Sequence, residues 1–329
     1  MKSISFFLLI FLSLCISCVN KDKHQILVTP QIEYDVLINN PDKVMNWWIQ
    51  NIEGPKREML VDAICKTALS GQNKISGFVF DTISKKFRHY FPLTSEQLKT
   101  LLTQDFIQNI NKIRFKEEWR INEKTLQIEK KVNGIAPVIA MYNDSGAFIG
   151  NKVLFWIDLD TNKNNKDSEK TLITKRIQYD VFIKGPDSLK DWWVDNIEKT
   201  DREKLAEIII KNVSSGKKKI YDFPFNTLLK DNEIQAILHP VKKVILKRNK
   251  APFDNYDTTI VQSFTSDKIV KLRFLEEWSF NPATLAFEKK VLGIAPIIEN
   301  YSIEGIFRGF TPLFWIYFDE KYPANDMKM

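Results

Sequence analysis

The tryptophans of this chain occupy matched positions, and this repetition limits the possible fold more than any other feature. The chain has 329 residues and 8 tryptophans, and every tryptophan has a partner in a second copy of the same pattern. The partners are Trp47-Trp48 with Trp192-Trp193, spaced by 145 residues, and Trp119 with Trp278 and Trp156 with Trp315, each spaced by 159 residues.

The sequence around Trp119 gives the strongest match between the two copies. Residues 113–137 and 272–296 share 16 identical residues in 25 aligned positions. The step in spacing from 145 to 159 residues means that the second copy carries a 14-residue insertion between its two parts. Each copy also has the usual size of a domain. The sequence therefore predicts two tandem homologous modules.

Within each module the hydrophobic pattern changes from a helical period to a strand period. Apolar residues first recur at helical spacing around Trp47 and Leu60. They then alternate with polar residues over 113–121 and 126–132, as in an antiparallel hairpin. We expect Gly134-Ile135-Ala136-Pro137 to end the return strand, because proline cannot donate to a β-ladder. Each module is therefore predicted to be α+β, with N-terminal helices followed by an antiparallel β-meander.

The composition divides the chain into six segments. A short strand is predicted to open each module, at 34–38 and at 179–183, and a stretch rich in Asp, Asn, Lys and Thr separates the modules. The predicted segments are a signal peptide (1–18), a tether (19–31), the first module (32–159), a linker (160–175), the second module (176–320, with its insertion around 228–264) and a tail (321–329).

The N-terminus has the pattern of an export signal. Lys2 supplies a positive charge, and the apolar run Phe6–Leu14 is too short to anchor the chain stably across a bilayer. Ser17 before Cys18 fits lipoprotein processing, in which Cys18 becomes the acylated first residue. We expect a lipidated Cys18 followed by a polar tether. The alternative is an ordinary secretory signal that is cut near the same place.

The third cysteine and the histidines form no recognisable reactive site. Cys65 lies in an apolar helical stretch and corresponds to Ile210 of the second copy, so we expect it to be buried. The histidines His24, His89 and His239 are not repeated and have no metal-ligand spacing. We therefore expect no metal and no cofactor. The sequence also has no glycine-rich phosphate loop and no nucleophile elbow.

The chain carries a net charge of +7, and its densest basic run lies inside the insertion of the second module. Such a run attracts lipid head groups, glycan phosphates or an acidic partner, and a solvated loop is the alternative. Nucleic acid is not the expected partner, because no aromatic residues interleave the run. The run consists of Lys242, Lys243, Lys247, Arg248 and Lys250.

Glu117 and its counterpart Glu276 lie on the apolar side of their predicted strands. If the four-residue turn at 122–125 sets the register, Glu117 faces Lys130 and Glu276 faces Lys289, although turn length fixes register only loosely. A partly buried structural ion pair is the favoured interpretation. A polar contact in an interface with another protein is the second. A general acid or base is the third, and it lacks a second titrating group.

The adjacent tryptophans Trp47 and Trp48, and likewise Trp192 and Trp193, would point in different directions on a helix. Both rings of a pair can face a broad apolar core, which is the favoured interpretation. A ring that faces outward would instead anchor a partner, because tryptophan is enriched at the energetic centres of interfaces.

Three motifs recur in the same order in both modules. They are Arg114–Trp119, Gly134–Pro137 and Leu154–Ile157, repeated as Arg273–Trp278, Gly293–Pro296 and Leu313–Ile316. This series resembles the GldN/PorN family of the gliding-motility and type IX secretion machinery of the Bacteroidetes, and the loop Gly216–Asp222 is also similar to a loop of that family. The resemblance covers most of each module.

The resemblance implies a non-enzymatic function. Members of the family are periplasmic and assemble with an outer-membrane lipoprotein (GldK/PorK) into large rings that support protein export and gliding. This chain differs in its two modules and its own lipidation signal. We expect an exported structural component that is anchored to the outer membrane through Cys18 and assembles with a GldK/PorK-like lipoprotein and other secretion-system components. The alternative is an envelope lipoprotein that binds glycan or anionic lipid through the basic run.

Overall fold

The computed structural model describes most of both halves of the chain. We call residues 24–159 the N-terminal half and residues 170–323 the C-terminal half. Cys18 and the paired tryptophans Trp47, Trp48, Trp192 and Trp193 lie outside the described residues, so the expectations for them stay predictions. The described segments are 24–39, 52–71, 73–80, 88–159, 170–185, 197–223, 226–261, 264–302 and 305–323.

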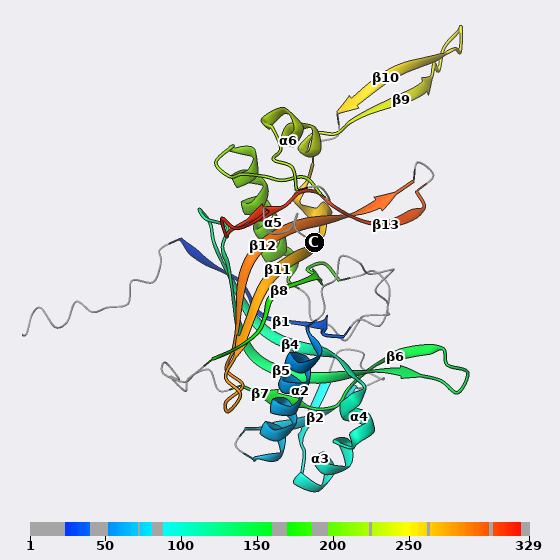
Figure 1. Cartoon of the computed structure of the whole chain (residues 1–329). Helices are drawn as coiled ribbons and strands as arrows, with labels where there is room; N and C mark the ends of the chain where they lie inside the picture. The colour runs from blue at the N-terminus through cyan, green and yellow to red at the C-terminus, as the bar shows by residue number, and fades with distance from the viewer. Residues whose placement is uncertain are drawn as a thin grey trace, which may run out of the picture.

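The N-terminal half is built on an antiparallel sheet that has seven strands in the described residues (Figure 1). The strand order is β1-β4-β5-β7-β2-β3, and β6 pairs with β5 next to β7. The strands are β1 (Gln25–Leu37), β2 (Ile75–Phe80), β3 (Arg88–Pro92), β4 (Ile110–Asn122), β5 (Ile128–Tyr142), β6 (Phe148–Val153) and β7 (Trp156–Asp158).

The C-terminal half contains a second antiparallel sheet and a separate hairpin. The sheet has the order β13-β12-β11-β8, with β14 paired to β12, and the hairpin joins β9 to β10. Both halves also carry helices, so the predicted α+β class with antiparallel sheets is confirmed. The strands are β8 (Thr171–Phe182), β9 (Val241–Lys247), β10 (Asn255–Val261), β11 (Ile269–Phe280), β12 (Phe287–Tyr301), β13 (Phe307–Pro312) and β14 (Ile316–Tyr317).

The helices begin and end at residues that favour helix termini. Pro55 lies in the first turn of α2, where its missing N–H costs nothing, and Gly71 beyond the helix has a φ of 70°, which favours glycine. Thr94 and Gln97 form a capping box at α3. Among the described residues, none of the helices could cross a bilayer. They are α2 (Gly54–Leu69), α3 (Ser95–Leu101), α4 (Gln104–Gln108), α5 (Lys199–Ser214), α6 (Asp231–Leu238) and the 3-10 helix η3 (Ser266–Lys268).

The segment Gly134–Pro137 does not end the return strand, and that prediction was wrong. β5 continues through it because Pro137 lies where β5 changes partner from β7 to β6. The backbone N–H of Leu154 donates to the carbonyl of Pro137 at 3.0 Å, and Leu313 donates to Pro296 at 2.9 Å in the other half. The backbone donor that proline lacks would therefore face the place where β5 changes partner, and its absence breaks no regular ladder there.

The first strand of each half is longer than predicted. β1 begins at Gln25 and β8 at Thr171, so residues 25–31 of the predicted tether and 171–175 of the predicted linker belong to sheets. In β1 the register shifts between Leu27 and Ile32. Such irregularities interrupt the alternation of apolar and polar residues from which a strand is recognised.

The two sheets pack against each other and share one hydrophobic core (Figure 1). β5 contacts β12, and β1 contacts β8. Each long helix also reaches the opposite half, since α2 contacts β8 and α5 contacts β1. Most buried apolar side chains of both halves belong to one continuous cluster, beside a small separate cluster in each half. The halves therefore share one core, and their interface lies inside it.

Cys65 provides a test of this packing. The thiol lies on α2, and burial together with the nearby Asp62 raises its pKa to about 11 from an ordinary 9.0. Only the thiolate reacts with alkylating reagents. In a chain with Cys15→Ser and Cys18→Ser, we expect iodoacetamide to modify the native protein roughly 100-fold more slowly than the urea-unfolded protein. Equal rates, followed by mass spectrometry, would show that Cys65 is accessible.

Candidate functional site at the interface of the two halves

Glu117 and Glu276 occupy equivalent places inside the shared core. Glu117 lies on β4 between Phe115 and Trp119, and all three side chains are fully buried. Glu276 has the same position on β11 and is equally buried. The alternation of side chains along each strand places both carboxylates on the face that packs against the other half. Two negative charges are thus held where water cannot reach them.

Each carboxylate forms an ion pair with the lysine of the opposite half. Lys289 Nζ lies 2.7 Å from Glu117 Oε1, and Lys130 Nζ lies 2.6 Å from Glu276 Oε1. None of the four side chains has any exposed surface. The pairs connect β4 with β12 and β11 with β5, so they join the two halves crosswise.

The predicted ion pairing within each hairpin is therefore wrong. On β4 the residue opposite Lys130 is Trp119, and the residue opposite Glu117 is Val132. The register differs by two residues from the one that a four-residue turn would give. The lysine consequently points toward the carboxylate of the other sheet.

The turn between β4 and β5 explains this difference. The backbone N–H of Asn122 bonds the carbonyl of Gln127 at 3.0 Å, so the turn closes two residues later than predicted. It contains Leu126 with a φ of 63°, and Leu285 in the equivalent turn has a φ of 55°. Both leucine side chains are fully buried. Leucine rarely adopts positive φ, so sequence propensity does not reveal such a turn, and core packing stabilises it instead.

Two tyrosine hydroxyls complete the network. Tyr34 on β1 donates to Glu117 at 2.6 Å, and Tyr179 on β8 donates to Glu276 at 2.5 Å. Each hydroxyl also accepts a hydrogen bond of 3.2 Å from the lysine of its ion pair. The two hydroxyl oxygens lie 3.4 Å apart. Tyr34 and Tyr179 begin the predicted opening strands but were not among the predicted site residues, although their spacing of 145 residues matches that of the first tryptophan pairs.

Aromatic side chains enclose the charged groups. The indole N–H of Trp119 donates to Glu117 at 2.7 Å, and Trp278 makes the same bond to Glu276. The ammonium of each lysine lies about 3 Å from the centre of a phenylalanine ring of the opposite half. Each carboxylate thus has one cation and two neutral donors. These contacts offset the large cost of removing the charges from water.

The environment sets the protonation states of the network. Burial alone would raise the pKa of Glu117, but the ammonium groups of Lys289 and Lys130 outweigh it and leave this pKa below its ordinary value. Burial lowers the pKa of both lysines despite the nearby carboxylates. Burial and the carboxylates raise the pKa of Tyr34 and Tyr179 well above the ordinary value. At neutral pH the tyrosines therefore stay protonated and donate.

The enclosed geometry opposes the interpretation of Glu117 or Glu276 as a general acid or base. A catalytic carboxylate must come within hydrogen-bond reach of the atom that it protonates. Both carboxylates are fully buried and already bonded to protein groups. Within the described segments, no group of three His, Cys, Asp or Glu side chains could hold a metal ion. The arrangement is suited to joining the halves.

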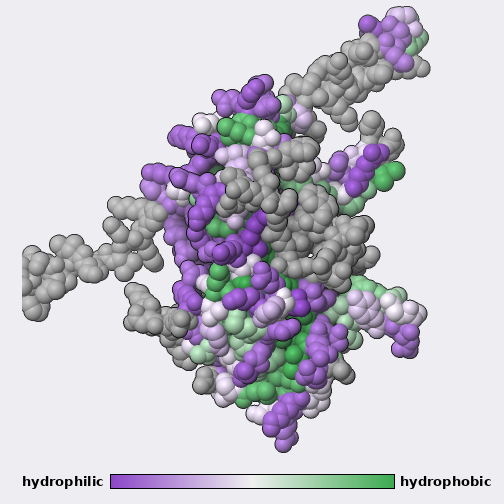
Figure 2. Space-filling view, viewed as in Figure 1, coloured by the Kyte–Doolittle hydropathy of each residue, from purple (hydrophilic) through white to green (hydrophobic). Residues whose placement is uncertain are grey.

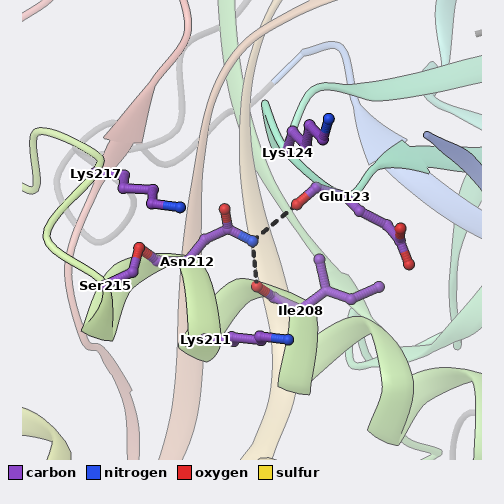
Figure 3. Close-up of a pocket in the computed structure, with 7 residues that line it drawn as sticks. All are labelled: Glu123, Lys124, Ile208, Lys211, Asn212, Ser215 and Lys217. Carbon is purple, nitrogen blue, oxygen red and sulfur yellow. Dashed lines mark hydrogen bonds between the residues drawn. The ribbon is translucent and has the colours of Figure 1, made fainter.

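Polar contacts at the edge of the interface join the halves further. Gln127 donates to the carbonyl of Val291 at 3.0 Å, and Asn212 on α5 donates to the carbonyl of Glu123 at 2.9 Å (Figure 3). A shallow pocket beside Asn212 is lined by three lysines and Glu123. In Figure 3 the side chains of Glu123 and Lys124 point away from Asn212. The charges of this pocket do not converge on one point, so it is best described as the edge of the interface.

The basic run lies on the β9–β10 hairpin, which projects from the body (Figure 1). Its first three lysines belong to β9, and Arg248 and Lys250 are exposed in the turn. Arg248 pairs with Asp254 at 2.9 Å, so part of the charge of the turn is neutralised.

Comparison with known protein families identifies the C-terminal half. Residues 169–328 match the family model of the gliding motility associated protein GldN. The C-terminal half belongs to the GldN family. No curated protein matches the chain. The matched segment contains Tyr179, Glu276 and Lys289, whereas their partners in the N-terminal half lie outside it. In this chain, the buried charges of a GldN-family segment are therefore neutralised by residues that precede the segment.

Loss of one member of a crossed ion pair should destabilise the protein more than loss of both. Lys289→Met leaves the Glu117 carboxylate buried without a cation, and we expect the free energy of unfolding to fall by about 3–5 kcal/mol. Adding Glu117→Gln removes the unpaired charge and should restore most of that loss. Urea denaturation of the two single variants and the double variant gives the coupling energy.

Two further pairs serve as controls. Combining Glu117→Gln with Lys130→Met should restore little, because that lysine neutralises Glu276. The pair Lys170–Glu288 is about half exposed, and its removal should cost less than about 1 kcal/mol. A larger coupling between Glu117 and Lys130 than between Glu117 and Lys289 would contradict the crosswise arrangement.

The lowered pKa of Glu117 predicts the direction of acid destabilisation. A group whose pKa is lower in the folded state contributes stability that is fully present above its unfolded pKa, ordinarily 4.5, and is lost as the pH falls through the folded pKa. From about pH 6 to about pH 3, the free energy of unfolding should therefore fall more steeply for the wild type than for Glu117→Gln/Lys289→Met. Parallel pH profiles would show that the pair does not couple folding to protonation.

Proposed function

We propose that this chain is a non-enzymatic structural component of a gliding or type IX secretion complex of the cell envelope, and that it works through assembly with other proteins. The GldN match of residues 169–328 supports its place in gliding motility. The crosswise ion pairs support the proposal that the chain is a structural component and not an enzyme. They hold the two halves in one arrangement, and their carboxylates are closed to any substrate.

We also propose that the halves are tandem homologous modules. Each half contributes one tyrosine, one glutamate, one tryptophan and one lysine to the network, from strands of matching order. Each half further contains a bidentate arginine–aspartate pair at the matching place, Arg114 with Asp35 and Arg273 with Asp180. Because the first strands begin at Gln25 and Thr171, we place the starts of the modules there, in place of residues 32 and 176.

The proposed location is the periplasm, with a lipid anchor at Cys18 in the outer membrane. The export signal and Ser17-Cys18 support this location. The expected partners are an outer-membrane lipoprotein of the GldK/PorK type and other components of the secretion system. An oligomer or ring of such complexes would need a rigid subunit, and a shared core provides one.

A second candidate function is the binding of glycan or anionic lipid through the β9–β10 hairpin. It is favoured by the exposure of Arg248, Lys250 and Phe253 at the turn. It is weakened by the ion pair between Arg248 and Asp254. We therefore prefer the assembly function.

Isolation of the native protein from gently solubilised envelopes, with light crosslinking, tests the proposal. We expect the chain in a large assembly that contains an envelope lipoprotein, and we expect the assembly to persist at raised salt, because apolar interfaces are not screened. Size determination and mass spectrometry of the crosslinked species give the result. A chain that runs as a monomer without partners would contradict the proposal.

Two variants test separately whether the lipid anchor and the basic run contribute to the assembly. Cys18→Ser should abolish labelling by radioactive palmitate while leaving the fold intact, because Cys18 precedes the sheets. Replacing all five residues of the basic run with glutamine should leave the assembly unchanged. If that variant instead loses its association with envelopes, and wild-type association falls with salt, the lipid or glycan function is favoured.

A further inference from the structure

The β5–β6 and β12–β13 hairpins project from the body of the protein (Figure 1). Each carries exposed aromatic residues near its end. In the β5–β6 hairpin, Tyr142 and Phe148 are cross-strand partners, 59% and 58% exposed. In the β12–β13 hairpin, Tyr301 and Phe307 are partners, 51% and 49% exposed. The ring centres of the pairs lie 6.0 and 5.7 Å apart. We call the two ends the aromatic tips.

The aromatic tips match each other in sequence and in backbone shape. Both residues of the second tip follow those of the first by 159 residues. A register shift adjoins each tyrosine, and a glycine follows each phenylalanine by two residues, with a φ of 146° at Gly150 and 125° at Gly309. Figure 2 shows hydrophobic residues on both projecting hairpins. Matching apolar residues at exposed positions are not explained by packing of the core.

The aromatic tips lie at the end of the molecule opposite the start of β1. Gln25 pairs with Asn122 beside the β4–β5 turn, whereas Tyr142 ends β5, which has 15 residues. A strand of this length spans about 50 Å when straight. The seven residues from Cys18 to His24 span at most about 25 Å. A chain that stands on an acylated Cys18 therefore holds its aromatic tips away from the bilayer.

We propose that the aromatic tips form a two-point docking surface for a protein partner with apolar recesses, on the side of the molecule that faces away from the anchoring membrane. The orientation rests on the proposed lipid anchor, and the contact chemistry rests on the exposed rings alone. Tyrosine and phenylalanine bury a large area with few rotatable bonds, so two such pairs suit a stable contact. Engagement at two points also raises the overall affinity without additional contacts.

Crosslinking inside cells tests this inference. A photoreactive phenylalanine analogue is placed at position 148 or at position 307 of the full chain, and the crosslinked species is identified by mass spectrometry. We expect both positions to yield the same protein partner. The matched controls are positions 27 and 172, whose leucines are also exposed and equivalent but lie toward the anchored end. They should yield no crosslink to that partner.

Aspartate substitution gives a second readout. Phe148→Asp/Phe307→Asp should reduce the amount of chain recovered with the partner by about tenfold or more, whereas Leu27→Asp/Leu172→Asp should not. Unchanged thermal unfolding would show that both variants are folded. Crosslinks to lipid, to a second copy of the chain or to nothing would overturn the inference. If wild-type chain enters the assembly and the aspartate variant does so equally, the inference fails while the proposed function stands.

Discussion

The crosswise ion pairs between the two halves are the interaction on which the rest of the structure depends. Glu117 and Glu276 lie in a core where an unpaired charge would cost several kcal/mol, and each forms its close ion pair with a lysine of the other half. A half that folded alone would instead leave this apolar face and its carboxylate exposed to water. Formation of the halves and formation of their interface are therefore coupled. Well-packed apolar residues in place of a buried ion pair are often as stabilising or more so, and we therefore infer that the charges serve to select one relative position of the sheets.

This coupling explains how the functional features are distributed over the molecule. The interior carries the closest ion pairs, and the carboxylates of Glu117 and Glu276 are already engaged by lysine, tyrosine and tryptophan side chains of the protein. Among the described residues, the β9–β10 hairpin and the aromatic tips project from a body whose two halves share one core (Figure 1). An assembly component needs such a division, because its contact surfaces keep a fixed spacing only when the body between them is rigid. The membership of the C-terminal half in the GldN family agrees with this arrangement.

The amino-acid sequence predicts which residues are buried in the core more reliably than it predicts their partners. The alternation from Ile113 to Ile121 correctly placed Glu117 among buried apolar side chains, and the repeated hairpin was visible in the 16 shared residues. The predicted partner of Glu117 was wrong because the β4–β5 turn contains Leu126 at a positive φ, which leucine seldom adopts, and this turn changes the register of the hairpin. The predicted end of the return strand was wrong because Pro137 lies where β5 changes its partner from β7 to β6. The sequence pattern carries no information about which strand pairs with that edge of β5.

The sequence by itself determined the α+β class, the antiparallel hairpins and the buried positions of the two glutamates, because these follow from the local period of apolar residues. It also contained the matched spacing that relates the halves. Only the tertiary structure decided that the halves share one core, that each lysine neutralises the opposite glutamate, and that Tyr34 and Tyr179 meet between them. The physical reason is that an ion pair is fixed by distance in space. Within one hairpin that distance follows from the turn, but between two sheets it depends on how their faces pack.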